Sequence, residues 1–256
     1  MAEQSTPQNS EPAAKGTLAT IGDFLARKGR RAWTLKVVEK SAIGPRMMRV
    51  TFRGDDVDEL EWRRGQDLVL EIPSGPDIAR RHYTIRHHEG KTLVIDFVLH
   101  GESPANDWVR NATPGSTLVA AGPRGRTVLN ESADWHLFVG DTTCIPAIFA
   151  MLEGLPATAK AFAFIEAEPD DTIAFAGTAT PQIEWIGRGA APGGRILFEA
   201  VDGFALPPGN GHAYVIGETS TVRAIRQRLL ARGFSKDRIA AEGYWRPGRI
   251  GGHDHA

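Results

Sequence analysis

Cysteine is nearly absent from this sequence, and Cys144 is its only example. A single cysteine excludes a disulfide within the chain and a CxxC metal site. It fits a reducing compartment, in which thiols stay reduced. We therefore expect a cytoplasmic protein.

The sequence also lacks a long apolar run and an excess of charge of one sign. No stretch of about 18 apolar residues is available to span a bilayer, and the polar start MAEQSTPQNSEPAAKG has no signal-peptide core. The 30 lysines and arginines are matched by 31 acidic residues, unlike in most nucleic-acid-binding proteins. Paired carboxylates, a catalytic triad and a metal-ligand cluster are missing as well. We therefore expect no membrane insertion, no nucleic-acid partner, no hydrolytic activity and no metal site in the folded domains. Whether His253 and His255 in the C-terminal tail bind a metal stays open.

The sequence does have the length and the apolar content for two domains. Its 256 residues exceed the ~100–150 of an ordinary domain, and 41% of them are hydrophobic. The change from a strand-rich pattern to an alternating one places the boundary near residues 127–134. We expect a disordered tail over 1–16, a first domain over 17–129, a second domain over 130–250 and a flexible tail over 251–256.

The first domain has the rhythm of an antiparallel barrel. Six short runs of β-branched or apolar residues lie between Trp33 and about Gly125, and turn signals such as GP, RGDD and PSGPD separate them. Six short strands of this kind predict an antiparallel β-barrel. We expect a helical insert over about 105–112 and a further short helix around 18–25.

The second domain alternates strands with helices. WHLFVG leads into DTTCIPAIFAMLEG, AFAFIEA and IEWIGRG follow, and HAYVIG leads into ETSTVRAIRQRLLARG before RIAAEGYW ends the series. This alternation predicts a parallel sheet with right-handed crossovers. The expected fold class is therefore a β-barrel followed by an α/β domain.

The segment RRHYTIR carries the first candidate site. Alternation along a strand places Arg81 and Tyr83 on one face, while Thr84 turns to the other face or lies at the strand end. The guanidinium can bind a pyrophosphate, the phenol ring can stack on an isoalloxazine, and the hydroxyl can bind near its reactive nitrogen. The pattern suits a flavin dinucleotide, and it also fits an ordinary exposed strand.

The segment DFVLHGESPANDWV, residues 96–109, carries the second candidate site. An apolar strand passes through a turn into a short helix, for which we predict Asn106 as the N-cap. The start of a helix presents N–H groups to an anion, so the pyrophosphate of FAD can bind there. A histidine such as His100 is more often a structural hydrogen-bonding residue than a catalyst.

Two strand ends in the second domain predict a nucleotide site. Gly140 ends one strand, and a polar turn and a helix with Pro146 in its first turn follow. Gly217 and Glu218 end a later strand, ahead of a helix that carries Arg223. Open α/β sheets bind ligands at the carboxyl ends of their strands, although a plain turn and a solvated helix face explain the same residues.

Six segments of the chain together resemble a known family. They are RHYTIR, DFVLHG followed by PA and a Trp, PGSTLVAAGPRG, GDTTCIPAI, GETSTVRAIR and GYWRPG. In these segments and in their order, over roughly residues 30–250, the chain resembles the siderophore-interacting proteins, which are flavin-dependent ferric-siderophore reductases of the ferredoxin-reductase-like superfamily. The chain departs from their usual pattern at Ser103, Asn106, Thr142 and Cys144.

The resemblance implies FAD in the barrel and a nicotinamide dinucleotide in the α/β domain, with Thr142 and Thr143 near the nicotinamide. Glu166, with Glu168 close behind it, favours NADH, because a carboxylate there accepts ribose hydroxyls and repels a 2′-phosphate. Arg188 favours NADPH, because it can bind that phosphate. Both donors stay open.

The predicted site residues form three groups. For FAD they are Arg81, His82, Tyr83, Thr84, Asp96, His100, Gly101, Pro104, Ala105, Asn106 and Trp245, the last of which equally fits core packing. For NAD(P)H they are Gly140, Asp141, Thr142, Thr143, Glu166, Arg188, Gly217, Glu218 and Arg223. For an anionic ferric siderophore, a basic rim of Arg124, Arg126, Arg246 and Arg249 is expected to concentrate the substrate.

The expected function is the reduction of a ferric siderophore with electrons from NAD(P)H through FAD, which releases Fe²⁺. One alternative is a flavin reductase or electron-transfer module for a protein partner, and ferredoxin is an alternative donor. Another is a siderophore-binding protein without turnover.

Overall fold

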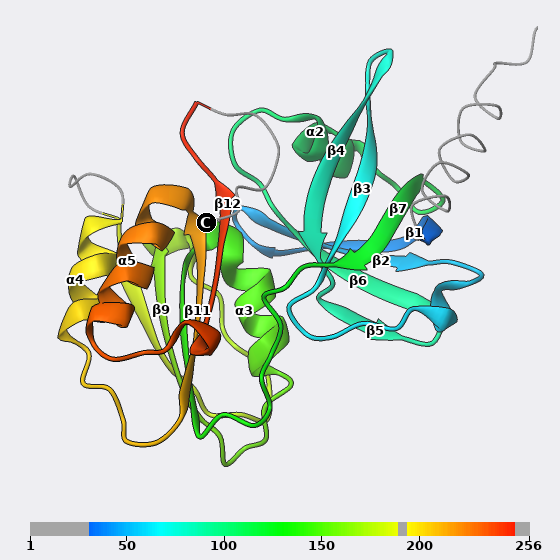
Figure 1. Ribbon diagram of the computed structural model, residues 1–256. Coiled ribbons are helices and arrows are strands. Elements are labelled where there is room, and N and C mark those ends of the chain that lie inside the picture. The colour runs from blue at the N-terminus through cyan, green and yellow to red at the C-terminus, as the bar shows by residue number, and fades with distance from the viewer. Residues whose placement is uncertain (1–30, 189–193, 249–256) are drawn as a thin grey trace, which may run out of the picture.

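The computed structural model describes residues 31–188 and 194–248. Both predicted tails, the predicted helix around 18–25 and Arg249 lie outside these residues. The described chain forms two sheets that lie side by side (Figure 1). None of its helices has the length and apolar character that crossing a lipid bilayer requires.

The N-terminal sheet is antiparallel and has the strand order β4-β3-β7-β1-β2-β6-β5. The predicted β fold is confirmed, but the number of six strands is wrong. The segment HYTIR spans a strand end, because β4 stops at Thr84 and the short β5 begins at His87. The strands are β1 (Ala32–Gly44), β2 (Met47–Arg53), β3 (Asp67–Ser74), β4 (Asp77–Thr84), β5 (His87–Glu89), β6 (Thr92–Val98) and β7 (Thr117–Arg124).

This sheet curls around one apolar core. Leu35, Phe52 and Leu70 are fully buried inside it. The rings of Tyr83 on β4 and Phe97 on β6 lie 4.3 Å apart between centroids, although these strands are not neighbours in the sheet. The edge strand β4 therefore bends toward β6, and the sheet forms a half-barrel. Helix α2 (Pro104–Asn111) packs Ala105 and Val109 into the same core.

The C-terminal sheet is parallel, as predicted, and has the strand order β10-β9-β8-β11-β12. Helix α3 covers the face toward the half-barrel, and α4 and α5 cover the other face (Figure 1). The strands are β8 (Trp135–Asp141), β9 (Lys160–Ala167), β10 (Gln182–Gly187), β11 (Gly211–Glu218) and β12 (Ile239–Trp245); the helices are α3 (Ile145–Leu152), α4 (Arg195–Gly203) and α5 (Thr219–Ala231).

Helix α4 has no counterpart among the predicted elements. Its buried residues Leu197 and Val201 are four positions apart, which is the spacing of one helix face. That spacing is the feature of the sequence from which helix α4 could have been predicted. Single 3-10 turns occur at η1 (Val57–Glu59), η2 (Thr142–Cys144), η3 (Pro169–Asp171) and η4 (Lys236–Arg238).

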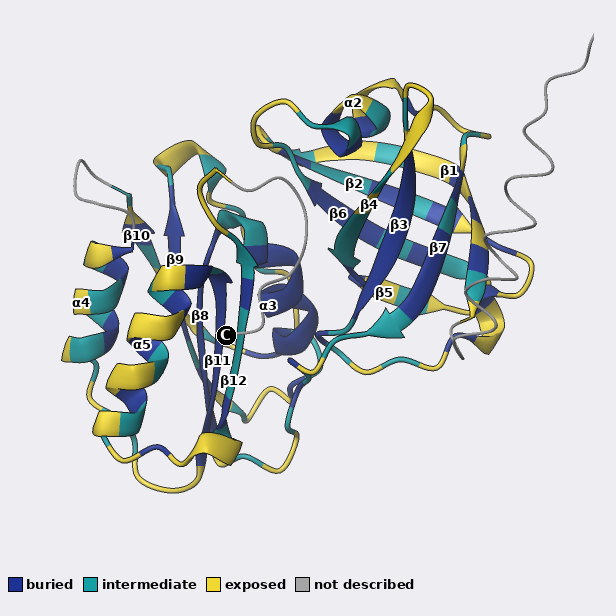
Figure 2. Ribbon diagram, turned by 45° about the horizontal axis from the view of Figure 1, so that its top comes forward, coloured by how far each residue is buried: buried dark blue, intermediate teal, exposed yellow. Residues whose placement is uncertain are grey.

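An extensive interface joins the two sheets. All eight residues of α3 are buried, which is visible as a dark helix between the sheets in Figure 2. Met47 of the half-barrel belongs to the apolar cluster of α3. Ion pairs also cross the interface, from Arg86 to Glu153 and from Arg46 to Asp171. The ends of β6, β8 and β12 are thereby brought to one cleft.

Candidate functional site

The flavin side of the site is built on the edge strand β4. Arg81 and Tyr83 lie on one face of it, as the alternation predicts, and both are partly exposed. One guanidinium nitrogen of Arg81, Nη1, donates to the carbonyl of Arg80 at 2.9 Å. The ring of Tyr83 packs on Phe97, and burial raises the pKa of its phenol, which keeps it neutral. This face therefore offers a cation and a flat apolar ring.

His82 and Thr84, the alternate residues of β4, point the other way. His82 Nδ1 lies 2.9 Å from Asp67 Oδ1, and Arg124 Nε lies 3.9 Å from the same oxygen. Thr84 is 7% exposed and hydrogen-bonds Tyr244 of β12. His82 and Thr84 thus contact other protein groups, and Thr84 links the two domains.

The turn before α2 differs from the prediction in one respect. Ser103 is the N-cap, and its Oγ accepts the N–H of Asn106 at 3.2 Å. Asn106 lies within the first helical turn, 1% exposed, and its Nδ2 donates to the carbonyls of His100 and Gly101. The N-cap assignment to Asn106 was therefore wrong. The residue instead fixes the His100–Gly101 turn, because a buried amide must satisfy its donors.

Asp96 is also engaged by other residues. It is 3% exposed, and Arg49 donates to both of its carboxylate oxygens at 2.7 Å. Arg86 Nε lies 3.3 Å from Oδ2. Asp96 anchors β6 to β2, and arginines of the same domain contact both of its carboxylate oxygens.

The remaining groups fit a flavin dinucleotide. Arg81 and the amides at the start of α2 suit a pyrophosphate, while the partly exposed ring of Tyr83 suits an isoalloxazine. Gly101 has φ +60°, and a Cβ on it would meet nothing within 4 Å, so the backbone of this turn is open to a ligand.

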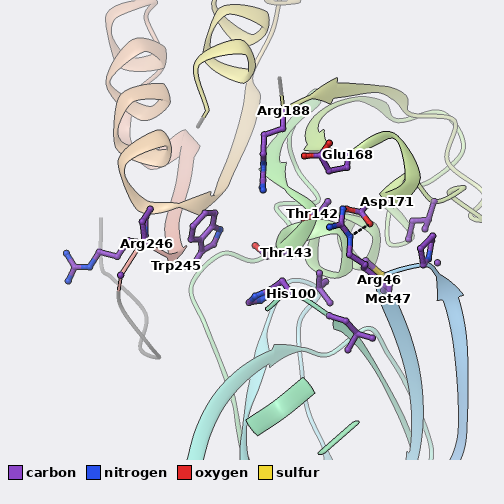
Figure 3. A pocket seen from close by; sticks show the side chains of 17 residues that line it. Arg46, Met47, His100, Thr142, Thr143, Glu168, Asp171, Arg188, Trp245 and Arg246 are labelled. Carbon is purple, nitrogen blue, oxygen red and sulfur yellow. Dashed lines mark hydrogen bonds and ion pairs between the residues drawn. The ribbon is translucent and has the colours of Figure 1, made fainter. Parts of the chain in front are cut away.

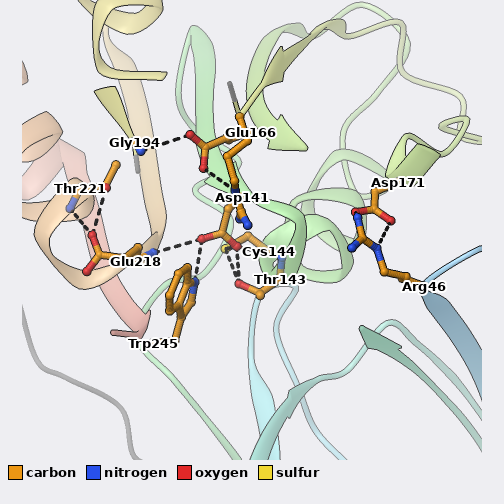
Figure 4. Close-up of polar contacts among 11 residues, drawn as sticks. Arg46, Asp141, Thr143, Cys144, Glu166, Asp171, Gly194, Glu218, Thr221 and Trp245 are labelled. Carbon is orange, nitrogen blue, oxygen red and sulfur yellow. Dashed lines mark hydrogen bonds and ion pairs between the residues drawn. The ribbon is translucent and has the colours of Figure 1, made fainter. Parts of the chain in front are cut away.

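On the donor side, Asp141 joins three strand ends (Figure 4). Its Oδ1 accepts the N–H and the hydroxyl of Thr143. Its Oδ2 accepts the N–H of Glu218 at 3.1 Å and the indole N–H of Trp245 at 2.8 Å. Asp141 is 4% exposed. It organises the predicted nucleotide site from within.

Glu218 caps the helix that follows it. Its carboxylate accepts the N–H groups and the hydroxyls of Ser220 and Thr221. Burial acts to raise the pKa of Glu218, but these hydrogen bonds outweigh it and hold the pKa below its usual value. The carboxylate therefore stays charged and stabilises the start of α5. Arg223 is exposed on α5 and lies outside the lining of the cavities described below.

Glu166 and Arg188 form a pair. Arg188 Nε donates to Glu166 Oε2 at 3.3 Å, and the N–H of Gly194 donates to Oε1 at 3.2 Å. Both oxygens of Glu166 are thus engaged, and its side chain is 7% exposed. Arg188 is 41% exposed and points into the cleft (Figure 3).

The cleft between the sheets encloses about 400 Å³. It collects the end of β6 with His100, the turn with Thr142 and Thr143, and Trp245 with Arg246 (Figure 3). Its other charged groups are Arg46, Arg188, Glu168 and Asp171.

The predicted basic rim comes together only in part. Arg246 lines this cleft, whereas Arg124 and Arg126 are not among its lining residues. Sequence reasoning missed Arg46 and Asp171. Arg46 sits in the GPRMM turn between two strands and looks like an ordinary surface residue until the second domain is placed against it.

Fold and site together define a two-domain reductase of the ferredoxin-reductase-like class. The fold alone is shared with the ferredoxin reductase of carbazole 1,9a-dioxygenase, at a TM-score of 0.71 and 17% identity over 84% of this chain and 70% of that one.

The chain belongs to the siderophore-interacting protein family. Residues 133–248 match the family model described as siderophore-interacting protein, and residues 63–127 match the siderophore-interacting FAD-binding domain. The ferric vibriobactin reductase ViuB of Vibrio cholerae is 31% identical over 84% of this chain and 89% of that protein. An NADPH-dependent ferric-chelate reductase of Escherichia coli is 28% identical over 68% of each chain. The crystal structure of a siderophore utilization protein from T. fusca has a TM-score of 0.78 and 29% identity, over 86% of this chain and 95% of that one.

Proposed function

We propose that this protein is an FAD-dependent reductase that uses NAD(P)H to reduce a ferric siderophore and release its iron as Fe²⁺. Hard oxygen ligands hold Fe³⁺ tightly and the softer Fe²⁺ weakly, so reduction is the release step. The balanced reaction converts one NAD(P)H and two ferric complexes into NAD(P)⁺, one proton, two Fe²⁺ and two iron-free siderophores. Bound FAD supplies the conversion from a two-electron donor to a one-electron acceptor.

One observation carries this proposal. The 400 Å³ cleft is bordered by the end of β6 from the FAD-binding sheet and by the ends of β8 and β12 from the nucleotide sheet. Arg81 and the start of α2 would hold the FAD pyrophosphate, and Tyr83 would orient the ring. The cleft itself is lined by Thr142 and Thr143 of the donor turn and by His100 from the turn before α2.

We further propose NADPH as the preferred donor. Support comes from Glu166, whose two oxygens are engaged by Arg188 and Gly194, so that it is poorly placed to accept a ribose diol. The same contact uses Nε of Arg188 and leaves the terminal nitrogens of its exposed guanidinium for a phosphate. The Escherichia coli relative is named as NADPH-dependent.

The donor assignment is tested by anaerobic stopped-flow bleaching of the flavin. Arg188→Ala should raise the apparent Kd for NADPH about 10-fold, which corresponds to the loss of one charge-assisted hydrogen bond. The apparent Kd for NADH should stay nearly unchanged. Arg228→Ala is the matched control, because Arg228 is an exposed arginine of α5 paired with Asp202. If NADH bleaches the flavin faster than NADPH does in both the wild type and Arg188→Ala, the NADPH assignment is refuted.

Cations in the cleft support a ferric siderophore as the acceptor. Arg246 and Arg46 line it, and Arg46 is paired with Asp171. Arg188 also lines the cleft, but it is assigned above to the phosphate of the donor. The test is anaerobic mixing of the reduced protein with several ferric siderophores in the presence of an Fe²⁺ trap. Flavin reoxidation that matches trapped Fe²⁺, at two Fe²⁺ per flavin, is the expected result. If NADPH bleaches the flavin but no ferric complex reoxidises it, the ferric-siderophore reductase function is refuted. A flavin reductase or an electron-transfer module for a protein partner would then be the remaining function.

A further inference from the structure

Helix α3 connects the donor turn with the far side of the domain interface. The turn at Thr142 and Thr143 lines the cleft, and residues 142–152 are helical without a break. The other end of this helical stretch, followed by Glu153, contacts the half-barrel. Because a close-packed interior transmits displacements, a shift of that end moves the donor turn as well.

Two arginines of the half-barrel hold this far end of α3. Arg86 binds both carboxylate oxygens of Glu153 through its two terminal nitrogens. Arg64 Nη1 donates to the carbonyl of Ala150 at 3.0 Å, and the stem of Arg64 fills the space that a Cβ on Gly154 would occupy. The dipole of a helix favours cations at its C-terminus. Charge and close packing together fix the end of α3 against the half-barrel.

Arg86 is itself held within the half-barrel. Its side chain is 7% exposed, and its Nε lies 3.3 Å from Oδ2 of Asp96. Its N–H donates to the carbonyl of Val94 on β6 at 2.9 Å. Backbone and side chain of Arg86 are thus attached to the first domain, and the guanidinium is a fixed point for α3 of the second domain.

The segment at the end of β4 combines the flavin face with the contacts between the domains. Tyr83 presents its partly exposed ring on that face. Thr84 hydrogen-bonds Tyr244 of β12. Arg86, three positions after the ring, binds Glu153. The segment therefore holds both α3 and the end of β12 in a fixed position relative to the face that suits the isoalloxazine.

We propose that Arg86 and Glu153 are positioning residues for hydride transfer, because their ion pair sets the place of the donor turn through α3. The inference rests on the proposed function. In that step a hydride, two electrons and one proton, leaves NADPH, which becomes NADP⁺, and reduces the oxidised flavin. A misplacement of ~1 Å can slow such a step about 100-fold. Neither residue lines the cleft, so loss of the pair should slow the transfer and leave donor binding intact.

The rate is tested by anaerobic stopped-flow bleaching of the FAD-loaded protein with NADPH. Glu153→Gln keeps the shape of the side chain and removes its charge. The limiting rate at saturating NADPH should fall about 10-fold, while the apparent Kd for NADPH stays nearly unchanged. Asp202→Asn is the matched control, because Asp202 pairs with Arg228 on the face of the sheet away from the half-barrel. An unchanged limiting rate, or a higher Kd alone, overturns the positioning role.

A second variant tests whether the two residues act as a pair. Arg86→Lys keeps a positive charge beside Asp96 but cannot bind both oxygens of Glu153 in the same way. It should slow bleaching as Glu153→Gln does, and the double variant should be no slower than the slower single variant, because both changes remove one contact. Additive losses overturn the pair. If Glu153→Gln does not fold, Arg86→Lys provides the rate test.

The link from the ion pair to the donor turn is tested without turnover. In the FAD-loaded protein without NADPH, hydrogen exchange measured by mass spectrometry should be about 5-fold faster at amides 143–145 in Glu153→Gln. It should be unchanged in Asp202→Asn. Unchanged exchange at the donor turn in both variants overturns the proposal. If the wild type is bleached by NADPH but reduces no ferric siderophore, the proposed function fails instead, and the rate and exchange tests still judge the ion pair.

Discussion

The two halves of the site use their polar side chains in opposite ways. On the flavin side, Arg81 and Tyr83 lie partly exposed on an edge strand. On the donor side, the carboxylates of Asp141, Glu166 and Glu218 are bound by N–H groups, hydroxyls or an arginine of their own domain. Polar residues at the ends of parallel strands here organise their loops, whereas those on the edge strand stay available to a ligand. A set of substitutions can test how far that contrast holds.

The largest expected effect comes from Asp96. It lies in the flavin half, but other residues of its own domain bind its carboxylate, as they do the donor-side carboxylates. Asp96→Ala leaves Arg49 and Arg86 facing a buried gap, and removing one partner of a buried ion pair costs about 3–5 kcal/mol. We expect that loss in the free energy of unfolding measured with urea, with FAD affinity of the folded fraction unchanged. Loss of FAD affinity at full stability would show that Asp96 contacts the cofactor.

Arg81 should show the opposite behaviour. Arg81→Ala is expected to weaken FAD binding about 10- to 100-fold, the equivalent of a charge-assisted hydrogen bond of ~1.5–3 kcal/mol, with little change in unfolding. Fluorescence titration of the flavin-free protein with FAD measures it. Arg80→Ala is the matched control, because Arg80 is the adjacent arginine and pairs with Glu71 on the other face. If both variants lose FAD affinity to a similar extent, the two faces of β4 do not differ in their role.

Most of the fold follows from the sequence, because the signals are local. Short β-branched runs specified the antiparallel sheet, and the alternation of strands and helices specified the parallel one. The missing strand, β5, has only three residues and forms through pairing with β6. Helix α4 was missed although Leu197 and Val201 carry the spacing of a helix face.

The site was predictable in its residue types but not in its contacts. Strand alternation placed Arg81 and Tyr83 correctly, because it depends on neighbours in the chain. The partners of Asp96 lie 47 and 10 positions away and become neighbours only when β2, β6 and the segment after β4 assemble. The cleft residue Arg46 required the packing of one domain on the other, which no local pattern encodes.

The core of the nucleotide domain should be the more acid-sensitive half. Burial, followed by the nearby His212, lowers the pKa of His136 to about 4. Its ring is 2% exposed, and its Nδ1 has no hydrogen-bond partner among the described residues. The unfolded chain takes up a proton on His136 near pH 6.5 and the folded chain does not. The contribution of His136 to stability is therefore constant above that pH and falls as the pH decreases toward 4.

The expected loss is on the order of 2 kcal/mol between pH 7.5 and pH 5. His136→Phe should flatten this pH dependence, because phenylalanine can stack on Phe138 and Tyr214 as the imidazole does. Urea unfolding at the two pH values provides the measurement. The same slope in His136→Phe as in the wild type would place the acid sensitivity elsewhere.

The smallest effect concerns the arginines at the mouth of the site, and it separates two residues that look alike in sequence. Arg246 is exposed and lines the cleft, whereas Arg124 lies 3.9 Å from Asp67 and is not among the lining residues. Arg246→Ala should therefore raise the KM for an anionic ferric siderophore a few-fold at low salt, while Arg124→Ala should not. Flavin reduction by NADPH should stay unchanged in both variants.

The effect of Arg246 should fade as salt rises from ~0.05 to ~0.5 M, because the Debye length falls from about 14 to about 4 Å. For a neutral ferric complex, the KM should be the same in Arg246→Ala and Arg124→Ala. If Arg124→Ala raises the KM as much as Arg246→Ala does, the substrate reaches beyond the cleft to the end of β7, and the basic rim predicted from the sequence acts as one surface.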